Sequence, residues 1–475
     1  MRKILLGTTA VAGAALMGLN VAHAQAPAPA TTLDRYLAGE PRGTPSAPGT
    51  FGVRIGGYFE FAGGYIRDSA DRNVLQGTPV TGATPGTFAA GPGTFRQSRS
   101  RYDFKTDTEI VVIVNGKAAN GLAYGAQVEL QIDNILVNAA SAAAGLGGGT
   151  GAGTSVDTDE AWGYIASPTL GTLMFGDQDS AASQMTVSLP GAVQQLGMST
   201  QWDEFIAITA ENTRYLVADI NDGNDSSKVI YLSPQFFGFD FGVSFAPNRR
   251  EGEEFRSGFS GVGPETQRLQ RDRDDIFPRN ELSWALRYRG TVGNIGVAAS
   301  FVGHRMDAPA VPSTAVQLRD VSEYQAGLNL SGFGVTVGGM YRWGAAAGVT
   351  GFPLRQGLKN GNTWGVGATY VTGPIAVGAF FARAERDNGP LFPDRTQRVW
   401  GFGASYVLAP GMELFANYTN LRDRNISNSI QNPTNLGFAP GTYGAGDAIT
   451  LVNGVPRVGV NRSADIFVVG TRITF

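Results

Sequence analysis

The chain has no cysteine among its 475 residues. An exported chain of this kind has no disulfide bonds, no thiolate metal site and no cysteine nucleophile. Charge is also scarce: only 16% of the residues are charged, whereas a soluble chain usually carries about 25%. The formal net charge of −3 does not provide the clustered basic surface that binds nucleic acid, so we expect no nucleic-acid partner.

Long hydrophobic runs are missing beyond the first 24 residues, so the sequence offers no membrane-spanning helix there. Residues 1–24 have the features of a secretory signal peptide. Arg2 and Lys3 precede an apolar stretch, and Ala22-His23-Ala24 is an A-x-A cleavage site. An uncleaved membrane anchor is the alternative. Residues 25–50 are rich in proline and alanine and lack periodicity, which is typical of a loosely held segment.

Glycine and aromatic residues are abundant instead, with 66 glycines and 10% aromatics. Together with low charge, this composition is typical of a protein that faces lipid through strands, because alternation keeps the mean hydropathy of each strand near neutral. Residues 101–115 show the alternation best. Tyr102, Phe104 and Ile110 share one face, while Asp103, Asp107 and Glu109 lie on the other. A row of charges cannot face a dry core, but it can line water.

The same alternation predicts sixteen strands between residues 51 and 475. They lie at 51–66, 101–115, 122–133, 160–167, 172–177, 228–233, 239–246, 280–290, 295–303, 321–331, 334–344, 362–373, 375–384, 398–409, 412–421 and 462–475. Short turns alternate with long polar loops, and we expect residues 67–98 to form such a loop. An even number of strands with this alternation of connections is typical of a closed antiparallel transmembrane β-barrel with short periplasmic turns and long extracellular loops. The alternative is a soluble β-protein with core aromatics.

The last strand carries a further signal. Phe467, Val469, Ile473 and Phe475 share one face, and Arg472 lies on the other. A strand that ends on a bare aromatic needs a partner for its open edge, and a closed barrel provides one because the last strand pairs with the first.

Five segments resemble alphaproteobacterial general outer-membrane porins: GVRIGGYFEF, FKTDTEIVVIVNGKAANGLAYGAQVELQID, WGYIASPTLGTLMFGDQDSA, KVIYLSPQFFGFDFGVSFAP and the ending VVGTRITF. The resemblance covers residues 51–475. It implies a trimeric channel of the cell outer membrane for passive diffusion of small hydrophilic solutes and ions. It also implies lipid and the barrel-assembly machinery as partners, with the terminal alternation ending at Phe475 as the assembly signal.

In this family the third long loop folds into the lumen, is acidic and faces a basic cluster on the wall. The resemblance therefore implies a constriction segment at about 177–227. Its acidic candidates are Asp177, Asp179, Asp203, Glu204 and Glu211. The alternation selects the wall candidates Arg54, Arg101, Lys105, Arg287, Arg289, Arg342 and Arg472. Facing charges of opposite sign set a transverse field, which favours small polar solutes over apolar ones. A solvated charge is the alternative for each of these residues.

Oxygen ligands are also close together within this loop. Asp219, Asp222 and Asp225 could bind Ca²⁺. The spacing does not match an EF-hand, because Asn224 stands where glycine is required. An Asx-stabilised turn is the alternative. We expect no other cofactor.

Three rival functions remain. A substrate-selective channel for a sugar or an anion would need a track of aromatics or arginines, and Tyr58 and Phe380 are the inward aromatics. A barrel-embedded hydrolase would have to use His304, which we expect to be solvated at a strand end, and no G-x-S-x-G motif is present. The sequence therefore predicts that the chain is not an enzyme. A plugged structural barrel would not conduct.

Overall fold

The computed structural model describes residues 48–69, 74–79, 88–96, 100–133, 155–190, 202, 205–206, 216–220, 226–248, 278–308, 318–346, 353–354, 356–388, 393–426, 451–452, 455–456 and 460–475. The predicted signal peptide and almost all of the segment 25–50 lie outside these residues. No helix among the described residues is long and apolar enough to cross a membrane.

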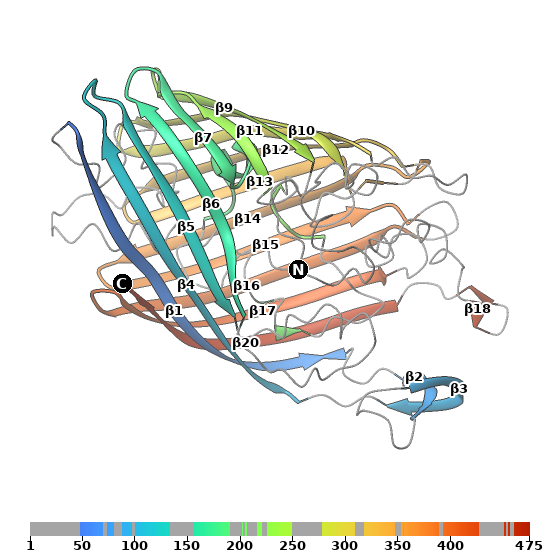
Figure 1. The fold of residues 1–475 in the computed structure, drawn as a ribbon. Coiled ribbons are helices and arrows are strands. Elements are labelled where there is room, and N and C mark those ends of the chain that lie inside the picture. Colours follow the sequence, from blue (N-terminus) through green and yellow to red (C-terminus); the bar gives the residue numbers. More distant parts are fainter. Residues whose placement is uncertain are drawn as a thin grey trace.

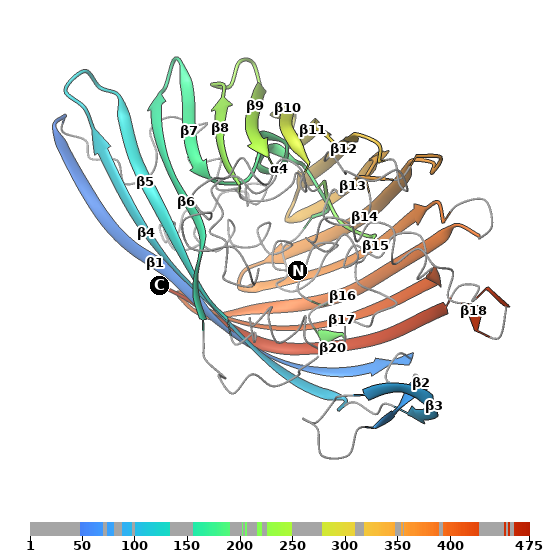
Figure 2. The ribbon, with the colours of Figure 1, turned by 45° about the vertical axis from the view of Figure 1, so that its right-hand side comes forward.

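Sixteen antiparallel strands close into one barrel (Figures 1 and 2). They are β1 (Thr50–Asp68), β4 (Tyr102–Lys117), β5 (Ala123–Asp133), β6 (Ser155–Ser167), β7 (Gly171–Asp177), β8 (Ser227–Leu232), β9 (Phe239–Asn248), β10 (Arg279–Val292), β11 (Ile295–Asp307), β12 (Val321–Gly332), β13 (Val335–Ala345), β14 (Gly361–Thr372), β15 (Ile375–Arg386), β16 (Arg395–Ala409), β17 (Met412–Ile426) and β20 (Val460–Thr474). Each pairs with its neighbours in the chain, and β1 pairs with both β4 and β20. The predicted number of strands and the predicted closure are confirmed.

Two short hairpins lie outside the barrel: β2 (Val74–Pro79) with β3 (Phe88–Arg96), and β18 (Leu451–Val452) with β19 (Val455–Pro456). The expectation that 67–98 is wholly a loop was wrong. β2 and β3 contain glycine and proline and do not alternate, so the apolar period that identified the barrel strands could not reveal them. Figure 1 places this hairpin at the end of the barrel that carries the long connections.

The short turns follow local rules. Phe333 and Gly334 connect β12 to β13, and both have positive φ, at 55° and 79°. Two central residues with positive φ form a type I′ turn, whose twist matches that of the flanking strands. Gly373, with φ of 55°, begins the equally short turn between β14 and β15. These tight turns leave one end of the barrel compact.

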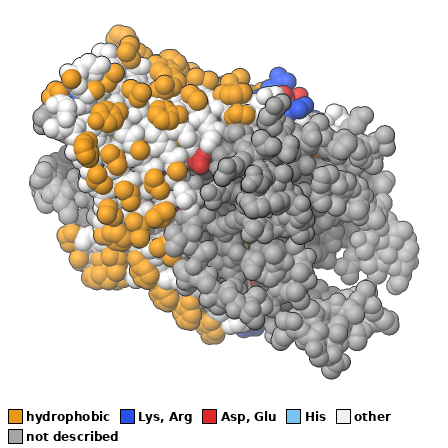
Figure 3. Space-filling view, viewed as in Figure 1, with side chains coloured by type: hydrophobic (Ala, Val, Ile, Leu, Met, Phe, Trp, Pro, Cys, Tyr) orange, Lys and Arg blue, Asp and Glu red, His pale blue; other side chains and the backbone are white. Residues whose placement is uncertain are grey.

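The outer surface is apolar, as the alternation predicts. Along β9 the side chains of Phe239, Phe241 and Phe245 are exposed, whereas those of Asp240 and Ser244 are buried on the inner face. Figure 3 shows hydrophobic side chains spread over the described part of this wall. Tyr288, Tyr370 and Tyr406 lie close to the short-turn end of their strands, whereas Trp284, Trp364 and Trp400 lie nearer the opposite end. This arrangement is typical of the two interfacial girdles of a membrane barrel.

The closing strand presents the predicted apolar face outward. Phe467, Val469, Ile473 and Phe475 are between 41% and 52% exposed, and Arg472 is buried on the inner face. The inner face holds a difference from expectation, because Ala464, Ile466 and Val468 are also buried there, in an apolar cluster. The reason is that Trp202, Phe205 and Ile206, from the connection between β7 and β8, belong to the same cluster.

Candidate functional site

The connection between β7 and β8 is bonded to the inside of the wall. It begins with the short helix α4 (Ala181–Met185), whose N-cap is Ser180. The amide of Ala181 donates to the hydroxyl oxygen of Ser244 on β9 at 3.0 Å, and the amide of Ala182 donates to that of Ser283 on β10 at 3.1 Å. Figure 2 shows α4 beside β9, β10 and β11. Serines on the inner face therefore accept hydrogen bonds from helix amides that have no partner within the helix.

The backbone after α4 lies directly on the next strands. The amide of Val187 donates to the hydroxyl oxygen of Ser300 on β11 at 2.7 Å. A Cβ added to Gly327 on β12 would stand 1.7 Å from the carbonyl oxygen of Val187. Only glycine permits this approach. The loop backbone thus contacts the wall at a position where the wall has no side chain.

A second part of the same connection, Leu216–Ile220, is held by Arg342 on β13. The guanidinium donates from Nη1 to the carbonyl oxygen of Asp219 and from Nη2 to that of Leu216, both at 3.0 Å. The amide of Ile220 donates to Gln325 Oε1 on β12 at 2.7 Å. Arg342 was predicted as a wall residue, and its side chain points inward to the loop. Its planar fork fixes two carbonyl groups of the loop at once.

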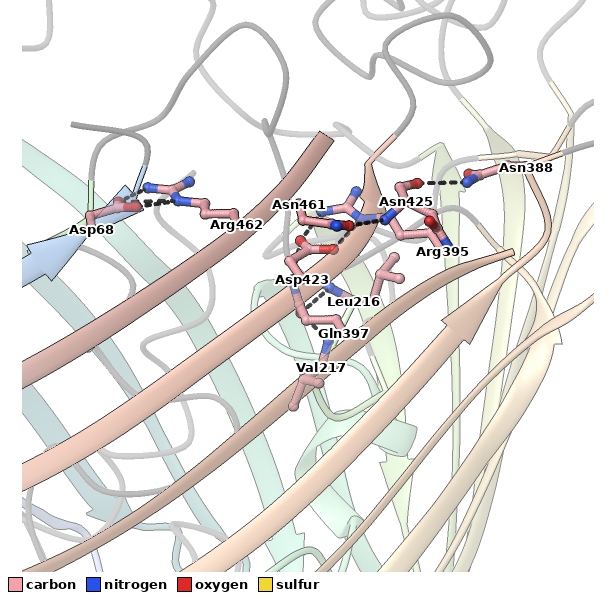
Figure 4. Close-up of polar contacts among 10 residues, drawn as sticks. All are labelled: Asp68, Leu216, Val217, Asn388, Arg395, Gln397, Asp423, Asn425, Asn461 and Arg462. Atoms are coloured by element: carbon pink, nitrogen blue, oxygen red, sulfur yellow. Dashed lines mark hydrogen bonds and ion pairs between the residues drawn. The ribbon is translucent and has the colours of Figure 1, made fainter. Parts of the chain in front are cut away.

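Gln397 on β16 holds the other side of that segment (Figure 4). Its Oε1 accepts from the amides of Leu216 and Val217, at 2.7 and 2.9 Å. Its Nε2 donates to Asp423 Oδ2 at 2.9 Å, and Asp423 also pairs with Arg395. Through Asp423, the hydrogen bonds that hold the loop extend to β17.

Aromatic and aliphatic side chains of the loop fill part of the interior. Trp202, Phe205 and Ile206 are buried in the apolar cluster that includes Ile466 and Phe380 of the inner wall. A Cβ at Gly64 on β1 would meet the ring of Phe205 at 2.4 Å. Apolar inward residues on β20 are therefore covered by the loop rather than facing water, which explains why the expected polar inner face is absent there.

Carboxylates gather on a different part of the wall. Glu60 on β1, Asp107 and Glu109 on β4, Glu129 on β5 and Glu160 on β6 are buried inward-facing side chains. We call these five residues the acidic wall. The hydroxyl of Tyr58 donates to Glu109 Oε1 at 2.8 Å. In the strand order β5 is separated from β13 by half of the barrel, so the acidic wall lies across from Arg342.

The predicted basic residues take different positions. Arg287 and Arg289 both bind Asp240, with Arg287 Nη2 at 2.9 Å and Arg289 Nη2 at 3.1 Å from Oδ2. Arg472 Nη1 lies 3.5 Å from Glu60 Oε2, and its guanidinium lies over the ring of Tyr58.

The remaining basic candidates lie on β1 and beside β4. Lys105 pairs with Asp107 at 3.3 Å. Arg54 occupies an inward, partly buried position on β1, and Arg101 is exposed immediately before β4. The structure does not bring the seven basic candidates into one cluster, because their strands are spread around the barrel.

The predicted acidic residues are only partly described. Asp177, at the end of β7, accepts from the hydroxyl of Ser227, and the carbonyl oxygen of Asp179 accepts from Gln184. Three candidates lie outside the described residues: Asp203, Glu204 and Glu211. In the expected calcium site, Asp219 Oδ1 accepts from Gln325 Nε2 at 3.0 Å. Asp222 and Asp225 also lie outside the described residues.

Several residues that hold the loop were not found from the sequence, notably Ser244, Ser283, Ser300, Gln325 and Gln397. Each stands at an inward position of its strand, but inward small polar residues are common in a barrel. Their partners belong to a segment without periodicity, so no local pattern connects the two. His304 was also placed wrongly: it is 1% exposed, with Nε2 3.7 Å from Glu323 Oε2, because its side chain points inward.

Comparisons with known proteins agree with this architecture. The family described as Gram-negative porin matches residues 7–426. A search of curated proteins finds no match. Among solved structures, the anion-selective porin from Comamonas acidovorans has a TM-score of 0.51 at 14% identity, over 90% of this chain and 100% of that one.

Two further solved structures show lower similarity. A loop-deletion mutant of OmpT, an outer membrane protein of Vibrio cholerae, has a TM-score of 0.47 at 11% identity, over 90% of this chain and 99% of that one. A double mutant of the Rh. blastica porin has a TM-score of 0.44 at 13% identity, over 89% of this chain and 100% of that one.

The family match extends over most of the chain. The fold is a closed sixteen-stranded barrel with an apolar outer face and charged residues inside. The chain therefore belongs to the Gram-negative porin family and is a multi-pass β-barrel channel of the outer membrane.

Proposed function

We propose that this outer-membrane diffusion channel is narrowed by the connection between β7 and β8 and that it favours cations over anions. The observation that carries the proposal is the uneven distribution of inward charges around the barrel. Arginines of the inner wall bond to carboxylates or to loop carbonyls, as Arg287 does with Asp240 and Arg342 with Leu216. The acidic wall gathers five carboxylates on four neighbouring strands, and two of them are paired, Glu60 with Arg472 and Asp107 with Lys105.

The sign of the preference follows from elementary electrostatics. A group of carboxylates on one side of a narrow, low-dielectric passage creates a negative potential that raises the local cation concentration. Arginines already paired with carboxylates contribute little field, because opposite charges at about 3 Å cancel at a distance. Small uncharged hydrophilic solutes would pass the same lumen by diffusion.

Reversal potentials across a planar bilayer test this proposal. With a salt gradient and EDTA on both sides, the wild-type channel is expected to give a potential of the cation-selective sign. The variant E109Q/E129Q/E160Q is expected to move the potential toward the anion side. The matched control is E385Q, which removes a half-exposed carboxylate that pairs with Arg383. An anion-selective wild-type channel would overturn the proposal.

A second candidate is an anion-selective channel, which belongs to the substrate-selective class. The observation in its favour is that two arginines of the inner wall, Arg287 and Arg289, lie on the same strand and bind the same carboxylate of Asp240. The same measurement separates the two candidates. R289A would weaken anion preference if this pair were the selective element, and would leave a cation-selective channel almost unchanged.

We also propose a homotrimer, assembled by the barrel-assembly machinery through its outward-facing terminal residues and surrounded by outer-membrane lipid. Membership of the porin family supports the trimer. Light scattering of the detergent-solubilised protein, before and after heating, measures the oligomer directly. A signal peptide of residues 1–24 predicts that the secreted chain begins at Gln25, which N-terminal sequencing would test.

We propose no catalytic activity. The buried pair of His304 and Glu323 faces the inside of the barrel, and burial of this kind supports a packing role. Purified protein is expected to hydrolyse neither ester nor phospholipid substrates. Hydrolysis that disappears in H304A would contradict this.

A further inference from the structure

Three carboxylates on adjacent strands point to one place inside the barrel. They belong to Glu109 on β4, Glu129 on β5 and Asp159 on β6, and one oxygen of each lies within 4.8 Å of the others. The register explains the convergence. Pairing of β5 with β6 shifts between Val128 and Leu130, so that Asp159 and Glu160 both stand opposite Glu129. Such a bulge re-aims a side chain that regular alternation would send to the other face.

Two of these carboxylates are buried with one oxygen unsatisfied. Glu109 is 0% exposed, and its Oε1 accepts from Tyr58, but its Oε2 has no hydrogen-bond partner among the residues that the structure describes. Glu129 is 4% exposed, and its Oε2 accepts from Gln127 Nε2 at 3.5 Å. Its Oε1 has no partner within the same described set. Buried carboxylate oxygens without a donor are costly, and a positively charged ligand between them would offset that cost.

The two neighbouring cations each pair with a carboxylate outside the cluster. Arg472 lies over the Tyr58 ring and pairs with Glu60, and Lys105 pairs with Asp107. Each of these two side chains therefore partners a carboxylate outside the cluster.

We propose that Glu109, Glu129 and Asp159 form a binding site for a divalent cation of the size of Ca²⁺. Carboxylate oxygens are the ligands that hard cations prefer, and Ca²⁺ binds them at about 2.3–2.6 Å in flexible geometry. Two oxygens on opposite sides of one such ion are about 4.6–5.2 Å apart, so the observed spacing needs no rearrangement. Tyr58 and Gln127 act as positioning residues, because Tyr58 holds Glu109 Oε1 and Gln127 holds Glu129 Oε2.

This site is separate from Asp219, which bonds to Gln325 on β12, and from the contacts that hold the loop. It joins three neighbouring strands of the wall, so a bound cation would stabilise their packing. The inference does not rest on the proposed ion selectivity, because binding is measured on the folded protein without any conductance.

The test is calcium binding by the folded protein in detergent, after treatment with EDTA and dialysis. Calorimetric titration with Ca²⁺ is expected to show one saturable site per chain, with a dissociation constant near the ~10⁻⁴–10⁻³ M of extracellular sites. E109Q/E129Q is expected to weaken binding at least tenfold. Y58F, which removes a positioning hydroxyl but no ligand, is expected to weaken it about 10–100-fold. The control E385Q should bind as the wild type does.

Thermal unfolding keeps the test decisive if a variant folds poorly. Calcium is expected to raise the unfolding temperature of the wild type and not that of E109Q/E129Q. In EDTA the double variant should unfold at the same temperature as the wild type or at a higher one. The reason is that neutral glutamines remove the repulsion between the buried carboxylates. The proposal would be overturned if the wild type showed no saturable binding at a Ca²⁺ concentration tenfold above ~10⁻³ M, or if E109Q/E129Q bound Ca²⁺ as tightly as the wild type.

Discussion

Phe475 exchanges two backbone hydrogen bonds with Gly57: its amide donates to the Gly57 carbonyl at 3.1 Å, and the Gly57 amide donates to its carbonyl at 3.0 Å. The last residue of the chain thereby closes the barrel onto the first strand. Gly57 has a φ of 154°, and an added Cβ would lie 2.0 Å from the carbonyl oxygen of Glu109. Closure therefore depends on a position where β1 approaches β4 without a side chain.

Replacing Gly57 by alanine should destabilise the closed barrel. The added Cβ forces apart the backbones of β1 and β4 and strains a backbone conformation that L-residues rarely adopt, which costs about 1–3 kcal/mol or more. The matched control is G52A on the same strand, where an added Cβ meets nothing within 4 Å. Unfolding by guanidinium in detergent measures both. Equal midpoints for G57A and G52A would contradict this account of closure.

The side chain of Phe475 can be separated from its backbone bonds. F475A keeps both hydrogen bonds to Gly57 but removes the terminal aromatic ring, which is 52% exposed on the outer face. If the ring is the assembly signal, F475A should accumulate less folded barrel in cells while folding normally into lipid vesicles without the machinery. A variant that assembles in cells at the wild-type rate would show that the ring carries no signal.

Arg342 should control how firmly the loop is held. R342A leaves the carbonyl groups of Leu216 and Asp219 without their charged donor, and each such bond is worth about 1.5–3 kcal/mol. In this variant the amides of Leu216, Val217 and Ile220 are expected to exchange hydrogen faster. The single-channel conductance is expected to be larger and noisier than that of the wild type.

Two variants serve as controls for Arg342. R342K retains the charge but lacks the planar fork, so it should recover only part of the protection of the loop amides against hydrogen exchange. R305A removes an exposed pair with Asp320, which is worth about 0–1 kcal/mol, and should leave exchange in the loop unchanged. Loss of protection in R305A equal to that in R342A would argue against a specific role for Arg342.

The free-energy cost of a charged side chain on the outer face should depend on its depth in the bilayer. Val366 lies midway along β14 and is 52% exposed on the outer face, whereas Ile375 is exposed at the short-turn end of β15. V366R is expected to lower the free energy of unfolding in lipid vesicles by about 2–4 kcal/mol, and I375R by about 0–1 kcal/mol. Equal costs at the two positions would mean that Val366 does not face the middle of the bilayer.

The barrel itself could be predicted because its pattern is local. Each strand carries its own alternation of apolar and polar residues, as Tyr102 to Val114 does, and each turn carries its own glycine. Sixteen such segments in sequence leave an up-and-down barrel as the arrangement that pairs every edge. The outward face that ends at Phe475 follows from the same period of two.

Only the tertiary structure decided which inward residues meet. Leu216 and Gln397 are 181 residues apart, and no periodicity relates a loop amide to a distant strand. The bulge that turns Asp159 toward Glu129 also breaks the alternation on which the sequence argument relies. The sequence by itself determined the number of barrel strands and, where the alternation is regular, which side chains point inward, because strand periodicity is set by neighbouring residues. The position of the loop and the convergence of carboxylates were decided by register and by contacts between distant residues, which exist only once the barrel has closed.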